Sequence, residues 1–266
     1  MQKTLLVMAL VLSSYNFAQD KSIKDSPKFI EESMQKAGIR MDQITGYRLE
    51  YHIKSDYKND NLIKRESFAE NGDLVSTEII SYNDKNEILS REVKNNDDSL
   101  IILYTYEYSH EGYVVTKSEN DVIITKTEYI LDLSKNIISE KENNLLEEGN
   151  LFIEKTNEYK NNFLIKTNVK YNNGNYSIVY KNNDKGNPIE EEYLNNGKKL
   201  INKFLRKYDT NNNLIEETTF DANSKVQNIT KILYEYDTHK NWTKRTQYAS
   251  KFEMPISNTI RTIRYN

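Results

Sequence analysis

Several residue types that often reveal a function are scarce or absent in this chain. Its 266 residues include no cysteine, three prolines and eight glycines. Without cysteine the protein has no disulfide, no thiol nucleophile and no thiolate metal site. So few prolines are compatible with long strands, because proline donates no hydrogen bond to a ladder. Beyond the N-terminus there is also no apolar run long enough for a transmembrane helix.

The charge of the chain is balanced and evenly spread. The net charge is −3, and Lys and Arg alternate with Glu and Asp instead of gathering in a basic stripe. Such a chain has no bulk attraction for nucleic acid or for an anionic membrane. We therefore expect no nucleic-acid partner and no transmembrane segment.

Residues that commonly carry catalysis or hold a metal occur in no recognisable arrangement. The histidines are His52, His110 and His239, and none has a second ligand at metal-site spacing. Glu190 and Glu192 share one face of a strand, but no partner carboxylate across a cleft accompanies them. The sequence therefore predicts a protein that is not an enzyme and has no cofactor.

Residues 1–18 have the pattern of a secretory signal peptide. Lys3 supplies the positive start, Leu5 to Leu12 form a short apolar core, and cleavage after Ala18 makes Gln19 the first mature residue. We therefore predict export to the periplasm, the cell surface or the medium.

Residues 19–43 are predicted to form a lead that contains a short helix. The lead begins with a flexible polar stretch, and Ser26 and Pro27 then offer a helix N-cap and first turn, while Gly38 offers a stop. Between them the helical spacing places Phe29, Ile30, Ser33, Met34 and Ala37 on one side. Such an amphipathic helix would cover the edge or open end of a sheet.

Residues 44–266 are built on a short repeat. The unit is an aromatic residue, five residues with a turn signal, and an apolar residue. Its copies are Phe68–Leu74, Tyr82–Ile88, Tyr108–Val114, Tyr208–Leu214 and Tyr236–Trp242, with looser copies at Leu131–Ile137 and Phe220–Val226. The aromatic residue ends one strand, the Asp or Asn after it folds the backbone back, and the apolar residue opens the next strand. The sequence therefore predicts an all-β domain of antiparallel β-hairpins.

One position in each turn is predicted to need a positive φ. It is occupied by Gly72, Asn86, Gly112 and Asn212, which tolerate that conformation. Other copies carry Lys135, Ser224 and Lys240 at this position, and for those turns we expect a different geometry.

Charge on both faces of the strands distinguishes between kinds of sheet. Ile189–Tyr193 and Leu214–Thr218 each place acidic residues on both faces. A sandwich strand keeps one face apolar, and an outer-membrane barrel keeps its lipid-facing positions free of charge. We therefore predict a single sheet of hairpins, open or coiled, in which tyrosines and long charged side chains cover each other.

Two segments resemble YD repeats, the units of the Rhs family. They are Tyr208–Glu217 and Tyr236–Arg245, and the end of the chain, with Tyr234 to Arg245 and Ile260 to Tyr265, is similar to short exported YD-repeat-like bacterial proteins. In large Rhs proteins the resemblance implies a coiled β-sheet shell around a C-terminal toxin, for which we count too few repeats here. Phe68–Leu74 and Tyr193–Lys199 also resemble MORN-type repeats, which build an open sheet of hairpins.

A row of tyrosines is the one candidate binding site. Tyr104, Tyr106 and Tyr108 project from one face of a strand, and Tyr234 with Tyr236 would extend such a stripe. Aromatic stripes stack on sugars or accept a partner protein, although they also serve as plain cross-strand pairs. We therefore predict a binding or envelope-structural role with a protein or glycan partner. The alternative is a component of a toxin or secretion system, as a shell fragment or an immunity partner.

Overall fold

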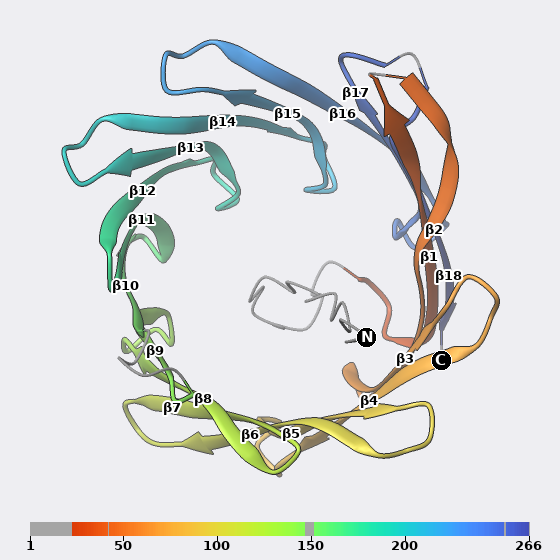
Figure 1. Cartoon of the computed structure of the whole chain (residues 1–266), viewed down its shortest axis with the longest axis vertical. Helices are drawn as coiled ribbons and strands as arrows, with labels where there is room; N and C mark the ends of the chain where they lie inside the picture. The colour runs from red at the N-terminus through yellow and green to blue at the C-terminus, as the bar shows by residue number, and fades with distance from the viewer. Residues whose placement is uncertain (1–22, 42, 147–151, 253, 266) are drawn as a thin grey trace, which may run out of the picture.

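The computed structural model is an all-β ring of strands, whose inner side we call the lumen (Figure 1). It describes residues 23–41, 43–146, 152–252 and 254–265. The predicted signal peptide, residues 1–18, lies outside the described residues. In the described part no helix is long and apolar enough to cross a membrane.

Eighteen strands make up the sheet. The first nine are β1 (Pro27–Arg40), β2 (Gln43–Lys58), β3 (Asn61–Phe68), β4 (Leu74–Tyr82), β5 (Ile88–Asn95), β6 (Leu100–Tyr108), β7 (Gly112–Glu119), β8 (Val122–Leu131) and β9 (Ile137–Asn144). The others are β10 (Phe152–Lys160), β11 (Phe163–Tyr171), β12 (Gly174–Asn182), β13 (Pro188–Asn195), β14 (Leu200–Tyr208), β15 (Leu214–Phe220), β16 (Val226–Tyr236), β17 (Trp242–Ala249) and β18 (Ser257–Tyr265).

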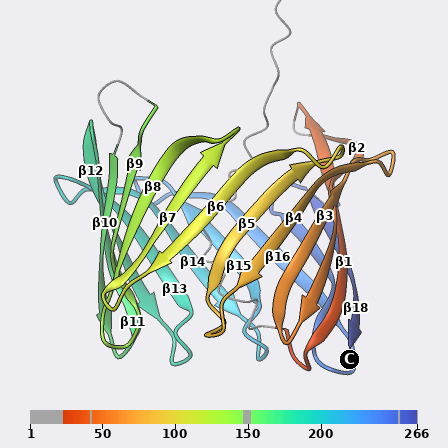
Figure 2. The ribbon, with the colours of Figure 1, turned by 90° about the horizontal axis from the view of Figure 1, so that it is seen from below.

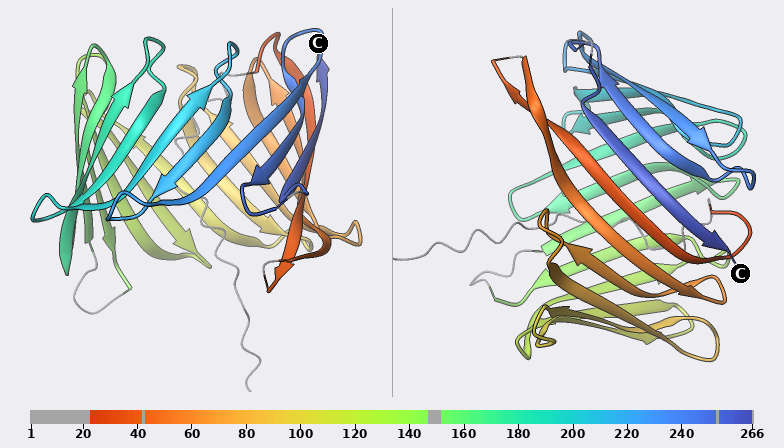
Figure 3. Two further views of the ribbon diagram at one scale, coloured as in Figure 1. Left: turned by 90° about the horizontal axis from the view of Figure 1, so that it is seen from above. Right: turned by 90° about the vertical axis from the view of Figure 1, so that its right-hand side faces the viewer.

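The sheet is a closed antiparallel barrel. Each strand pairs with the next one along the chain, and β1 pairs with both β2 and β18, which closes the ring. The strands cross the wall at a tilt, as the side views show (Figures 2 and 3). The prediction of an open or coiled sheet was therefore wrong. A barrel this wide has a lumen that accepts paired charges, so charge on both strand faces does not exclude closure.

The predicted N-terminal helix was also wrong. Residues Pro27–Arg40 form β1, which is hydrogen-bonded on both sides. The helical spacing of Phe29, Ile30, Met34 and Ala37 is real, but Ile30 and Met34 also share one face of a strand, and Ile30 is buried there. Pairing on two edges outweighs the local helix signals, which are a weak preference.

The hairpin turns follow one geometry. In the turn after β4, the side-chain oxygen of Asn83 accepts hydrogen bonds from the N–H groups of Lys85 and Glu87, both at 2.9 Å. The fourth residue of the turn, Asn86, then has φ of 67°. Positive φ is likewise confirmed at Gly72 and Asn212.

The expected departures from this geometry do not occur. Lys135, Ser224 and Lys240 have φ of 65°, 62° and 65°, so these turns repeat the common geometry. The Asp at the start of each turn bonds the backbone strongly enough to hold a non-glycine residue in the left-handed region. Asp221, for example, accepts from the N–H groups of Asn223 and Lys225 at 2.9 Å.

Gly112 is a glycine for another reason. Its φ is not positive, contrary to the prediction. A Cβ atom there would lie 1.8 Å from the carbonyl oxygen of Tyr129 on the neighbouring strand. The turn between β6 and β7 is shorter than the repeat unit suggests, because Tyr108 pairs directly with Tyr113.

Regular bulges and tyrosine hydroxyls shape the wall. Register shifts recur one residue from the turn, as between Ser81 and Tyr82, and such bulges increase the twist that curves a sheet. Tyrosines of the repeat then tie neighbouring strands together. The hydroxyl of Tyr82 donates to the carbonyl of Leu62 at 2.8 Å, and that of Tyr208 donates to the carbonyl of Pro188 at 3.0 Å.

Candidate functional site

The two faces of the wall differ in crowding. Residues paired in a ladder point to the same side, so the register assigns strand side chains to one of two faces. On one face Glu78 and Glu191 are only 10% and 11% exposed, while on the other Lys181 and Lys207 are 67% and 70% exposed. Side chains converge on the concave side of a curved sheet, so the crowded face is the lumen.

The outer face carries Lys–Glu pairs between neighbouring strands. Lys181 bonds Glu190 at 2.6 Å, and Lys203 lies between Glu190 and Glu192 at 3.2 and 3.1 Å. Glu190 and Glu192 thus share a face, as predicted, but they lie within the sheet and are paired with lysines. The hydrogen bond from Lys181 holds the pKa of Glu190 below its usual value. Beside these pairs the same face exposes apolar side chains such as Leu205, which pairs with Glu190, and Ile260, which pairs with Lys244.

The lumen face holds its charges in compact clusters. The carboxylate of Glu78 lies between the guanidinium groups of Arg65, at 3.1 Å, and Arg91, whose Nε is 2.8 Å away. On the other side of the ring Arg206 bonds Glu191 and, at 2.8 Å, Glu217. Charged side chains that are largely removed from water are tolerated when each is paired with an opposite charge in this way.

A third lumen cluster lies where the barrel closes. Glu32 of β1 accepts from Arg261 of β18 at 2.7 Å and from the hydroxyl of Tyr51 of β2 at 2.6 Å. The guanidinium of Arg261 lies 3.7 Å from the centre of the Trp242 ring. This cluster joins the strands on both sides of the closing ladder.

The predicted tyrosine stripe lies on the lumen face. Tyr104 pairs with Arg91, and the alternation of strand positions places Tyr106 and Tyr108 on the same side. The Arg91 guanidinium lies 5.0 Å from the centre of the Tyr104 ring. Burial raises the pKa of Tyr106, and burial beside Glu87 raises the pKa of Tyr108 to about 12.

Two further tyrosines continue the stripe across neighbouring strands. The Tyr113 ring lies 5.5 Å from that of Tyr108 and stacks on that of Tyr129 at 4.6 Å. Burial raises the pKa of Tyr113 to about 12. Tyr113 and Tyr129 were not predicted from the sequence, although pairing the strands on either side of the Ser109–Glu111 turn places Tyr113 opposite Tyr108.

Other aromatic residues form separate groups. Tyr234 and Tyr236 belong to β16, on the opposite side of the ring from β6, so they do not extend the stripe (Figure 1). A second row crosses β12 to β14, where Tyr176 lies 6.1 Å from Tyr193, and Tyr193 lies 5.9 Å from Phe204. The lumen therefore presents aromatic rings on separate stretches of its wall.

The histidines are dispersed. His52 bonds Glu31 at 2.8 Å, and His110 is an exposed turn residue beside Glu111. His239 bonds Asp25 at 2.7 Å. Within the described ranges, no group of three His, Asp or Glu side chains is arranged to hold a metal.

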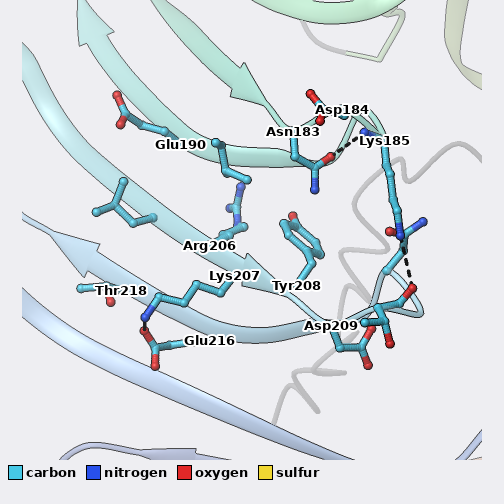
Figure 4. A pocket seen from close by; sticks show the side chains of 14 residues that line it. Asn183, Asp184, Lys185, Glu190, Arg206, Lys207, Tyr208, Asp209, Glu216 and Thr218 are labelled. Carbon is cyan, nitrogen blue, oxygen red and sulfur yellow. Dashed lines mark hydrogen bonds and ion pairs between the residues drawn. The ribbon is translucent and has the colours of Figure 1, made fainter.

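A hollow of about 850 Å³ opens between the turns that follow β12 and β14 (Figure 4). Lys185 reaches across it, and its ammonium donates to the carbonyl of Thr210 at 3.2 Å. Lys207 bonds Glu216 at 2.7 Å, and this bond holds the pKa of Glu216 below its usual value. Arg206, which also lines the hollow, bonds Glu191 and Glu217.

Comparisons with known proteins yield only distant likenesses. No family model matches the sequence, and no curated protein matches it. One similar structure is a porin-like protein from Bacteroides uniformis, at 10% identity and TM-score 0.47, covering 89% of this chain and 96% of that one.

Two further similar structures both contain TccC3. The TcdB2-TccC3-Cdc42 structure matches at 10% identity and TM-score 0.37, over 81% of this chain and 14% of that one. The Photorhabdus luminescens Tc holotoxin pore matches at 9% identity and TM-score 0.18, over 78% and 19%. At these values the likenesses carry no conclusion about function, and the YD repeats stay a resemblance.

Proposed function

We propose that this chain is an exported, non-enzymatic binding protein that receives a ligand inside its lumen. The observation that carries the proposal is the position of Tyr104, Tyr106 and Tyr108 on the lumen face, continued by Tyr113 and Tyr129. These rings offer flat apolar faces, and burial raises the pKa of Tyr108 and Tyr113 to about 12, which keeps their two hydroxyls protonated. Such a surface suits a glycan or an extended peptide that stacks on it.

Ion pairs on both faces of the wall are compatible with contact with water on either side. The lumen face also carries the aromatic residues and the most buried ion pairs. A ligand in the lumen would meet aromatic rings and charged groups that are held in place on a concave wall. Absence of an enzymatic role is part of the same proposal, because the lumen carboxylates are paired with arginines.

A glycan array and a pull-down from a cell-envelope extract test this function. The test variant replaces Tyr104, Tyr106 and Tyr108 with Ser, and the matched control replaces Tyr176 and Tyr193 with Ser in the second aromatic row. We expect the test variant to lose capture at least tenfold while the control keeps it. Unchanged capture by a folded test variant would show that the stripe is structural.

The closed lumen also favours a second candidate, a component of a toxin or secretion system. Resemblance to the Rhs family implies a shell around another chain, and a closed wall is what such a shell requires. Genes for a toxin or secretion machinery next to this gene would support this candidate. If no such genes lie next to this gene, the binding function in the lumen is favoured.

A further inference from the structure

The segment before β1 is held by the side chain of Asn241. The Lys24 N–H donates to the Asn241 Oδ1 at 2.8 Å, and the Asn241 Nδ2 donates to the Lys24 carbonyl at 3.0 Å. One amide side chain thus satisfies both main-chain groups of one residue, as a neighbouring strand would. Asn241 is 3% exposed, so its amide is shielded from water.

The residues on either side of Lys24 meet side chains of different chemistry. Ile23 lines a small pocket together with Trp242 and Arg261. Asp25 bonds the Nδ1 of His239 at 2.7 Å. The site therefore offers a pocket beside Trp242, a pair of main-chain hydrogen bonds and a polar contact to three consecutive residues.

The hydrogen bonds around Asn241 recur in the preceding repeat unit, whereas the bound segment Ile23–Asp25 is not part of a repeat unit. The hydroxyl of Tyr265 bonds Asp237 and, at 2.8 Å, the amide of Asn241. One unit earlier, Tyr236 bonds Asp209 and Asn213 with the same geometry. Asn213 lines the same pocket but binds no main-chain segment among the described residues.

We propose that the Asn241 site binds an extended peptide segment and that Ile23–Asp25 is its resident ligand. The main-chain bonds make recognition tolerant of sequence, and the flanking contacts favour an apolar residue before the clamped residue and an acidic residue after it. Because β1 tethers this segment next to the site, its effective concentration is high, and a free peptide competes poorly. The site lies at β16–β18 and is independent of the tyrosine stripe.

The test uses the intact chain and a fluorescein-labelled peptide with the sequence of residues 20–27. Lys24→Pro removes the main-chain donor of the resident segment and leaves the site unaltered. We expect the peptide to bind Lys24→Pro at least tenfold more tightly than the unmodified chain, by fluorescence anisotropy. Adding Asn241→Ala to Lys24→Pro should abolish this gain, whereas adding Asn136→Ala, at the equivalent position of the turn after β8, should leave it.

Trp242 provides an independent readout, because it is the single tryptophan of the chain. Its emission should shift in Lys24→Pro and return when the peptide binds. If Asn241→Ala unfolds the barrel, His239→Ala replaces it and should weaken peptide binding several-fold. Equal affinity in all folded variants, binding of a peptide with proline at Lys24, or unchanged emission would overturn the proposal.

Discussion

Adding one methyl group at Gly112 probes how closely β7 and β8 approach each other. The added Cβ would lie 1.8 Å from the carbonyl oxygen of Tyr129, whereas real contacts stay beyond 3.0 Å. The backbones must therefore separate by 3.0 − 1.8 = 1.2 Å. No side-chain movement relieves the clash, because the opposing atoms belong to the backbone.

The cost follows from the hydrogen bonds on either side. The Leu131 N–H donates to the Glu111 carbonyl at 2.8 Å, and the Ser109 N–H donates to the Gly112 carbonyl at 2.8 Å. Separating β7 from β8 breaks the first of these bonds at a cost of about 1 kcal/mol, and the strain passed to the second bond, in the β6–β7 turn, adds to this. We expect Gly112→Ala to lower the free energy of unfolding by about 2–4 kcal/mol.

Gly72 is the matched control for this experiment. Its φ is 87°, and a Cβ there would meet nothing within 4 Å. Gly72→Ala should therefore cost only about 1 kcal/mol, the strain of a left-handed residue. Gly72→Asn should cost about 0.5 kcal/mol or less, because Asn occupies this position in other turns. Urea unfolding followed by circular dichroism measures all three. A Gly112→Ala cost no larger than that of Gly72→Ala would refute the steric argument.

Three further predictions concern charge and protonation. Glu78→Gln should lower the free energy of unfolding by about 2 kcal/mol in urea, because it removes the charge of a buried carboxylate that lies between two arginines; a cost below about 0.5 kcal/mol, as at a surface ion pair, would contradict this. Hydrogen bonds from the Asn136 side chain to Asp132, and from the Lys225 N–H to Asp221, lower the pKa of each carboxyl. Their contribution is present above the ordinary pKa of about 4 and is lost as the pH falls through the lowered value. Asp132→Asn with Asp221→Asn should therefore flatten the loss of stability in acid, and an unaltered acid profile would contradict the role of these bonds. Burial raises the pKa of Tyr108 and Tyr113 to about 12, so their contribution is present below the ordinary pKa of about 10 and is lost as the pH rises toward 12. Ultraviolet titration of tyrosinate should show a late-ionising group that disappears when the protein is unfolded; a single step near pH 10 in the folded protein would contradict the burial.

The hairpins were predictable because their signal is local. An aromatic residue, an Asp or Asn and an apolar residue at fixed spacing determine where each strand ends and the next begins. Closure was not predictable in this way, because it depends on β1 pairing with β18 across almost the whole chain. Local signals at Ser26, Pro27 and Gly38 favoured a helix, and only the two neighbouring strands override them.

The candidate site was predictable in part. Alternation along one strand was enough to place Tyr104, Tyr106 and Tyr108 on one face. Alternation cannot say that this face is the concave one, because that depends on the direction in which the whole sheet curves. Tyr113 and Tyr129 join the stripe through pairing between strands, which a search along a single strand does not detect.

The pairing order of the barrel has a consequence for how the chain acquires its structure. Every ladder except β1–β18 joins strands that are consecutive in sequence, so hairpins can form one after another as the chain becomes available. Until Ser257–Tyr265 arrives, β1 and β17 each keep an unpaired edge. Unpaired edges recruit other chains. A chain cut short before β18 should therefore aggregate edge to edge, even though it retains nearly all of its hairpins.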